Sequence, residues 1–335
     1  MAEPRDARSV LVLLDTPAEG LRSPARELLT LARGLGRTTA VALSAPSEAT
    51  LSGLAAHGVE LLLVADVGAL DPSVTHLSPV AAEALEVALA TAGADVVLLS
   101  SSFVNKEVAA RLARATGAGL VLDVAGVSDD PAQGGLVGSK RVFAGSWDVA
   151  CAVTAPVAVF TVRANAVVAA DAPARTQVVV EPFSVLPSAS ATAASLVART
   201  QHEAPVGGSG RPALAEAAYV VAGGRGTLGE FGPVEDLADA LGAAVGATRD
   251  AVDEGWVGHD AQIGQTGVTI APRVYIGAGI SGAPHHRGGM QASGVIIAVN
   301  NDPDSPIFEI ADFGVVGDLA DVLPQAAAEI RRHKG

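Results

Sequence analysis

The first half of the chain alternates short apolar runs with segments of helical periodicity. The apolar runs lie at residues 9–14, 39–44, 59–64 and 95–100. Each has the length of a strand that is buried on both faces. Ser23-Pro24 and Ser78-Pro79 each place a capping hydroxyl directly before a proline, which favours the first turn of a helix. The alternation predicts βαβ units that form a parallel, Rossmann-like sheet.

From about residue 134 the pattern changes. Two strand-like runs, KRVFAGSWDVACAV (140–153) and PVAVFTVRANA (156–166), follow each other without a helical segment between them. They predict an antiparallel addition to the parallel sheet. The next segment, 181–212, is rich in Ser, Thr, Pro, Gly and Ala and has little periodicity, which is typical of a crossing arm or linker.

A second βα series follows this segment. Its strand-like runs lie at 218–222, 243–247, 273–277, 294–300 and 313–317. Between the first two, Val234, Leu237, Ala238 and Leu241 fall on one face of a helix. The series predicts a doubly wound parallel sheet with a ligand crevice at the carboxyl ends of its strands. We therefore expect an α/β protein with an N-terminal domain at 1–190, a linker at 191–210 and a C-terminal domain at 211–335.

Composition narrows the classes of function. The 335 residues carry a formal net charge of -14 without a basic cluster, so nucleic acid is not an expected partner. No apolar run is long enough for a signal peptide or a bilayer span, and we expect a cytoplasmic protein without membrane insertion. Cys151 is the single cysteine and is interpreted as a small buried hydrophobe.

Predicted strand ends in the second series lead into unusual turns. The run GGRGTLGEFG (223–232) holds Gly224, Gly226 and Gly229 in GxGxxG spacing, but it does not open directly into a helix. A turn that merely needs glycine is as consistent with it as a pyrophosphate loop. Arg225 in this turn can reach an anionic ligand.

Two further strand ends supply polar groups. Thr248 and Arg249 follow one strand, and the run QIGQTG places Gln265 and Thr266 between glycines. Amides and side-chain donors here can approach a planar heterocycle closely. An ordinary surface turn remains the alternative.

The run GAGISGAPHHRGGM (277–290) predicts an anion site. Small residues at 281–283 lead into a helix that begins at Pro284, so backbone amides can face a diphosphate. His285 and His286 lack a third ligand at zinc spacing, and a hydrogen bond to a ligand ring suits them better. Asn300 and Asp318 follow the last two strands and either contact the ligand or cap a turn.

In order and spacing, these motifs resemble the alpha subunit of electron-transfer flavoproteins over 218–324. The resemblance rests on GGRG, LGAAVGATRDAVDEGWV, QIGQTGVTIAPRVYIGAGISGA, an HxxGM that ends at Met290, and AVNNDPDSPIFEIADFGVVGDLADVLP. SSSFVNKEVAARLA and RVFAGSWDVACAV in the first domain are weaker cues. The resemblance implies FAD in the second domain and a beta subunit, usually carrying AMP, against the first. It implies FAD contacts from Arg225, Thr248, Arg249, Ile263, Gly264, Gln265, Thr266, Ser281, Gly282, Ala283, Pro284, His285, His286, Asn300, Asp318 and Leu319, with no catalytic or metal-binding residue.

The family's role implies an electron carrier rather than an enzyme that transforms a substrate. It would accept electrons from dehydrogenases such as acyl-CoA dehydrogenases and pass them to a quinone oxidoreductase, as in fatty acid beta-oxidation. Arg249 and His286 are expected to stabilise the reduced flavin. The alternatives are a subunit of a bifurcating flavoprotein, a stand-alone flavin or nicotinamide oxidoreductase, and a module whose two domains merely hold nucleotides. The sequence offers no separate acid–base pair for an oxidoreductase.

Overall fold

The computed structural model describes residues 8–130, 132, 135–142, 147–195, 197–198, 210–264 and 266–334. The chain divides into two compact units, Met1–Arg141 with Asp148–Gln201, and Val142–Trp147 with His202–Gly335. Below they are called unit 1 and unit 2. No helix in the described part of the chain is long and apolar enough to cross a membrane.

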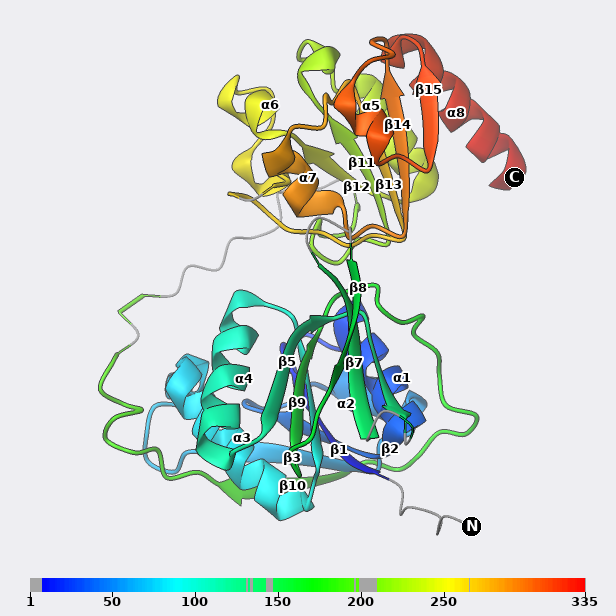
Figure 1. The fold of residues 1–335 in the computed structure, drawn as a ribbon. Coiled ribbons are helices and arrows are strands. Elements are labelled where there is room, and N and C mark those ends of the chain that lie inside the picture. Colours follow the sequence, from blue (N-terminus) through cyan, green and yellow to red (C-terminus); the bar gives the residue numbers. More distant parts are fainter. Residues whose placement is uncertain are drawn as a thin grey trace. The chain divides into compact units, whose positions relative to one another are not determined.

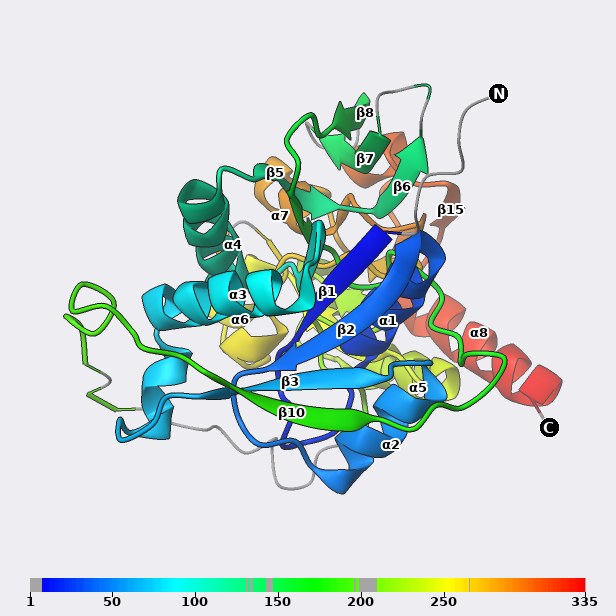
Figure 2. The ribbon, with the colours of Figure 1, turned by 90° about the horizontal axis from the view of Figure 1, so that it is seen from below.

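Unit 1 is built on a parallel sheet of seven strands in the order β10-β3-β2-β1-β4-β9-β5 (Figures 1 and 2). The strands are β1 (Arg8–Leu14), β2 (Gly36–Ala42), β3 (Leu61–Asp66), β4 (Val96–Ser100), β5 (Gly119–Val124), β9 (Ala158–Val162) and β10 (Val179–Ser184). The helices are α1 (Ser23–Leu35), α2 (Glu48–Ala56), α3 (Ser78–Ala92) and α4 (Phe103–Thr116), with a 3-10 turn η1 (Pro72–His76). The predicted Rossmann-like parallel sheet is confirmed.

Helices cover both faces of this sheet. Val10, Val12 and Leu14 of β1 pack in the cluster that contains α1 and α2. Leu11 and Leu13 pack in the cluster that contains α3 and α4. Figure 2 shows the two helix pairs on opposite faces of the sheet. Successive side chains of a strand point to opposite faces, so the apolar run of β1 fills both layers of the core.

The antiparallel addition begins earlier in the chain than the sequence predicts and does not include the run 156–166. Strands β6 (Gly126–Asp130), β7 (Gly135–Val142) and β8 (Trp147–Ala152) form a separate sheet of three strands, in which β6 and β7 are antiparallel. The prediction for the run 156–166 is wrong, because β9 lies in the main sheet, parallel to β4 and β5. All five residues of β9 are buried, which is the environment of a central parallel strand.

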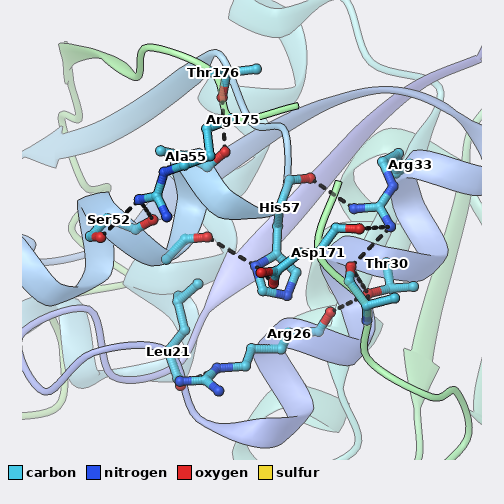
Figure 3. Close-up of polar contacts among 12 residues, drawn as sticks. Leu21, Arg26, Thr30, Arg33, Ser52, Ala55, His57, Asp171, Arg175 and Thr176 are labelled. Carbon is cyan, nitrogen blue, oxygen red and sulfur yellow. Dashed lines mark hydrogen bonds and ion pairs between the residues drawn. The ribbon is translucent and has the colours of Figure 1, made fainter. Parts of the chain in front are cut away.

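The connection from β9 to the edge strand β10, residues 163–178, passes over α1 and α2, and we call it the strap. The guanidinium of Arg33 donates to the carbonyl oxygens of His57 (3.1 Å) and Asp171 (3.3 Å), which Figure 3 labels, and to that of Ala170 (2.9 Å). β10 pairs with β3 over Val179–Ser184. The expectation that an irregular arm begins at residue 181 is therefore wrong for its first four residues.

Unit 2 contains a parallel sheet of five strands in the order β12-β11-β13-β14-β15. Its strands are β11 (Tyr219–Gly223), β12 (Ala244–Ala247), β13 (Val274–Ala278), β14 (Val295–Asn300) and β15 (Phe313–Val316). Its helices are α5 (Gly232–Leu241), α6 (Arg249–Asp253), α7 (Pro284–Met290) and α8 (Leu319–Lys334), with 3-10 turns η3 (Arg225–Thr227), η4 (His259–Ala261) and η5 (Pro306–Glu309). α5, α6 and α8 pack on one face and α7 on the other. The doubly wound sheet is confirmed.

Candidate cofactor site

The strand order of unit 2 changes direction between β11 and β13. From β11 the chain first moves outward to β12 and then returns to β13 on the other side. In doubly wound sheets, ligands bind outside the carboxyl ends of the strands at such a switch point. The predicted turns after β11, β12, β13, β14 and β15 all follow carboxyl ends of this parallel sheet, so they meet at one edge. The 262–268 turn joins that edge through the bridge of Gln262 to Ala247, at the end of β12.

The glycines of the first turn have a packing role. The amide of Gly224 donates to Ala278 O (3.0 Å), and that of Gly226 donates to Gly279 O (2.9 Å). A Cβ on Gly226 would lie 2.6 Å from the Cα of Gly279. The two turns at the switch point therefore contact each other through bare backbone, and this contact accounts for the glycines without a pyrophosphate.

Two arginines stand at neighbouring strand ends. Arg225 begins η3 and pairs with Asp250 (Nε to Oδ2 3.1 Å), while Arg249 begins α6 and pairs with Asp253 at the same distance. Both guanidinium side chains are about two-thirds exposed, at 70% and 67%. Surface pairs of this kind contribute only about 0–1 kcal/mol, so either arginine can exchange its carboxylate for a ligand anion. Thr248 caps α6 by accepting from the amide of Ala251 (3.4 Å).

The turn at 262–268 is held against β12. The amide of Ile263 donates to Ala247 O (2.9 Å), and Gln262 Nε2 donates to Thr266 Oγ1 (2.9 Å). Ile263 is buried, whereas Thr266 is exposed. Gly264 has φ +148, and a Cβ there would approach His285 O to 3.0 Å. Gln265 lies outside the described residues.

His286 is fixed by two internal hydrogen bonds. Its Nδ1 lies 3.1 Å from Ile263 O and its Nε2 lies 2.7 Å from the hydroxyl of Tyr275. A carbonyl oxygen can only accept, so Nδ1 carries the proton, and Nε2 accepts from the tyrosine. Burial lowers the pKa of His286 to about 4, although the bond to Ile263 raises it in part. The imidazole is thus neutral, and its two nitrogens clamp the 262–268 turn to β13.

Most residues around the start of α7 are exposed. Ser281, Ala283, Pro284 and His285 are exposed, and α7 begins directly after Ala283. Gly282 between them is buried with φ +84, and a Cβ there would lie 2.7 Å from the backbone of Ile307 in η5. A side chain at residue 282 would therefore strain the turn itself.

The last two strand ends differ in their surroundings. Asn300 is buried, and its Nδ2 donates to Ile280 O (3.0 Å) and Ser305 Oγ (3.1 Å). Asn300 thus holds the 279–283 turn in place through its hydrogen bond to Ile280 O. Asp318 is exposed and accepts from the amide of Ala320 (2.8 Å), and Leu319 is buried in the first turn of α8.

The described residues fit FAD. The small residues Ser281, Gly282 and Ala283 before α7 suit a diphosphate, and the arginines at 225 and 249 suit anionic groups at the same sheet edge. Tyr275 is the residue that sequence reasoning missed. It is the one hydroxyl-bearing residue in an otherwise apolar strand, VYIGA, and that irregularity was the available signal.

The fold and this edge define a two-unit α/β protein whose second unit carries a candidate cofactor site at the carboxyl edge of its sheet. Models of the "Electron transfer flavoprotein domain" and the "Electron transfer flavoprotein FAD-binding domain" match residues 10–187 and 213–291, respectively. The Mycobacterium leprae electron transfer flavoprotein subunit alpha is 43% identical over 330 residues, covering 97% of this chain and 99% of the relative. The Mycobacterium tuberculosis subunit alpha (strain CDC 1551 / Oshkosh) is 44% identical over 331 residues, with the same coverage.

A more distant relative spans nearly as much of the chain. The probable mitochondrial subunit alpha of Cryptococcus neoformans is 37% identical over 333 residues, covering 91% of this chain and 92% of the relative. The chain therefore belongs to the family of electron transfer flavoprotein alpha subunits, and its cofactor is FAD. The resemblance inferred from the second-domain motifs is confirmed.

Proposed function

We propose that this chain carries electrons on FAD within a heterodimer with an electron transfer flavoprotein beta subunit. It accepts them from dehydrogenases such as acyl-CoA dehydrogenases and passes them to a quinone oxidoreductase in the cytoplasm. It does not transform a substrate of its own. In this proposal residues 1–190 contact the beta subunit, 191–210 link the domains, and 211–335 bind FAD.

One observation carries the proposal: the turns after β11, β12, β13 and β14 meet at one sheet edge. Two exposed arginines and the exposed small residues Ser281 and Ala283 stand there. We propose FAD contacts from the turns at this edge. The set is Arg225, Thr248, Arg249, Ile263, Gly264, Gln265, Thr266, Ser281, Gly282, Ala283, Pro284, His285, His286, Asn300, Asp318 and Leu319. FAD supplies an isoalloxazine ring that takes up and returns one or two electrons.

The chain's own residues then hold and tune the cofactor. A guanidinium stays charged at every pH at which the protein is folded, so Arg249 offsets added negative charge without moving a proton. His286 contributes differently, because its nitrogens already bond Ile263 and Tyr275. It positions the 262–268 turn and adds no positive charge.

Ala283 provides a sharp test of where the diphosphate lies. This residue is the exposed N-cap of α7, and either aspartate or asparagine at an N-cap stabilises a helix. Ala283→Asp adds a negative charge beside the proposed diphosphate, and Ala283→Asn adds the same shape without charge. Like charges in contact cost about a few kcal/mol, so we expect FAD affinity to fall at least about tenfold in the aspartate variant only.

The measurement is the ratio of flavin to protein absorbance after dialysis, with the melting temperature as the check on folding. Both variants should melt at or above the wild-type temperature. Equal FAD content in the two variants would place the diphosphate elsewhere. Acyl-CoA dehydrogenase with its substrate should bleach the flavin of the wild type, and NADH alone should not.

A further inference from the structure

Successive carbonyl oxygens in the turn before α7 are held by the rest of unit 2. The carbonyl oxygens of residues 279–282 accept, in that order, from the amide of Gly226 (2.9 Å), Nδ2 of Asn300 (3.0 Å), the amide of Ile307 (3.0 Å) and Nε of Arg287 (2.5 Å). The C=O and N–H groups of a planar trans peptide point in opposite directions. The amides of residues 280–283 therefore point away from these donors, and none of them has a hydrogen-bond partner in the described part of the chain.

The Gly282 carbonyl depends on Arg287 alone. No other described residue donates to Gly282 O, whereas Ser281 O also accepts from the hydroxyl of Ser305 (3.2 Å). Gly282 has φ +84, and the backbone of a glycine rotates more freely than that of other residues. Without the guanidinium, the peptide between residues 282 and 283 can turn over and carry the amide of Ala283 away from a bound anion.

The Arg287 side chain is itself fixed by η5. Its Nη2 donates to the carbonyl oxygen of Pro306 and lies 3.1 Å from Oε2 of Glu309. The side chain is only 21% exposed, and the carboxylate of Glu309 offsets its charge. A planar guanidinium gives its donors fixed relative directions, so the contacts with η5 also fix the direction of Nε. Arg287 therefore acts on the turn through its geometry more than through its charge.

We propose that Arg287 is a positioning residue for the FAD diphosphate. It holds the Gly282 carbonyl on the protein side of the turn, so that the amide of Ala283 faces the diphosphate together with the neighbouring amides. The inference rests on the proposed function, which places the diphosphate at residues 281–283. It adds a residue that does not touch the cofactor but sets the direction of a group that does.

Two substitutions remove the donor to Gly282 O and differ in charge. In both Arg287→Met and Arg287→Lys, a carbon atom takes the place of Nε, but lysine keeps the positive charge. The heterodimer is stripped of flavin and titrated with FAD, and binding is followed by the quenching of flavin fluorescence. We expect the Kd for FAD to rise about tenfold or more in both variants, a factor equivalent to about 1.4 kcal/mol.

The ³¹P NMR spectrum of bound FAD provides a readout that general stability does not move. The diphosphate resonances should shift in both variants, because the hydrogen bonds to the phosphate oxygens change. If Arg287→Met does not yield a folded heterodimer, Arg287→Lys decides the question. Wild-type affinity and an unshifted spectrum in Arg287→Lys would overturn the proposal, since charge alone would then suffice.

Arg331→Met is the matched control. Arg331 also ties two elements of unit 2, because from near the end of α8 it donates to Oδ1 (2.6 Å) and to the carbonyl oxygen (3.2 Å) of Asp236 in α5. This variant should lower the melting temperature and leave the FAD affinity and the ³¹P spectrum unchanged. The role of Arg287 is refuted if Arg287→Met binds FAD as the wild type does, or if Arg331→Met weakens binding to the same extent.

Ala283→Asp separates this inference from the proposed function. If Ala283→Asp and Ala283→Asn hold FAD equally, the diphosphate lies elsewhere and the proposed position fails with the role of Arg287. If Ala283→Asp loses FAD while Arg287→Met keeps wild-type affinity, the position of the diphosphate stands and only the role of Arg287 fails.

Discussion

The Tyr275–His286 pair shows how unit 2 accommodates two titratable side chains in its interior. Burial raises the pKa of Tyr275 and lowers that of His286 to about 4, so both are neutral at physiological pH. The hydroxyl of Tyr275 donates a hydrogen bond to Nε2 of His286, and the Nδ1–H of His286 donates one to the carbonyl oxygen of Ile263. A buried donor or acceptor without a partner would cost about 1–3 kcal/mol, which explains why the pair and the carbonyl occur together.

The depressed pKa of His286 makes the stability of unit 2 depend on pH. Unfolded histidine has its ordinary pKa of 6.5, so between pH 6.5 and about 4 the unfolded chain binds more protons than the folded one. The contribution of neutral His286 to the free energy of unfolding is therefore complete above pH 6.5 and is lost as the pH falls towards about 4. His286→Gln cannot titrate, and we expect the drop in unfolding free energy from pH 7 to 4.5 to be smaller by about 2 kcal/mol in this variant.

Urea titrations at the two pH values measure this drop, with Trp256 fluorescence followed in a Trp147→Phe background. His285→Gln is the matched control, because it removes an exposed imidazole one residue away. The unfolding free energy of this control should fall from pH 7 to 4.5 by as much as that of the wild type. An equal pH dependence in all three proteins would mean that His286 is not buried as a neutral group.

At the scale of elements, the strap 163–178 secures the edge of the seven-stranded sheet. Besides its bonds to Arg33, the amide of Ala172 donates to Ala56 O (2.8 Å), and that of Thr176 donates to Ala55 O (3.0 Å). Arg175 Nη2 adds bonds of 3.0 Å to the carbonyl and hydroxyl oxygens of Ser52 (Figure 3). The strap thus ties α1 and α2 to the segment that delivers β10 to its place beside β3.

Arg33→Met should loosen the strap while preserving the apolar stem of the side chain. Its guanidinium bonds three carbonyl oxygens, and a hydrogen bond to a charged group contributes a net of about 1.5–3 kcal/mol where water is excluded. The bonds to Ala170 and Asp171 are exposed and contribute less than this. We expect the amides at 170–172 to exchange with deuterium about tenfold faster or more. Arg37→Met, an exposed change in β2, is the control and should leave these amides as they are. Unchanged exchange in Arg33→Met would show that other contacts hold the strap.

At the scale of the molecule, unit 1 leaves apolar side chains at its β10 edge uncovered. Val179 in β10 and Leu186, two residues after the strand, are 52% and 92% exposed. Edge strands and apolar side chains of this kind favour association with a partner. In our proposal the beta subunit packs against residues 1–190, which include this edge.

Expression with and without that subunit checks the proposal. Produced alone, the chain should aggregate or carry little FAD, and co-expression should yield a heterodimer with FAD bound. Light scattering after size-exclusion chromatography gives the mass, and absorbance gives the flavin ratio. A monodisperse, fully flavinated monomer would contradict the expected dependence on a partner.

The sequence by itself determined the elements of unit 2. Its five strands lie within one residue of the predicted runs at every boundary, because short apolar runs and Gly- or Pro-containing turns are local signals. The same turns indicated the family and placed its motifs at strand ends. Conformational preference and burial on both faces are encoded within each segment, so neighbouring segments were not needed to recognise them.

Only the tertiary structure decided which distant segments meet. The insertion of β9 between β4 and β5, and the pairing of β10 with β3, depend on contacts between segments far apart in the chain. The Tyr275–His286 bond likewise joins a strand to a helix, and the contact of Gly226 with Gly279 joins two turns. The sequence of one segment does not specify which parallel strand or buried polar group becomes its partner. The free energy of such a contact is gained only when the core has brought both partners together.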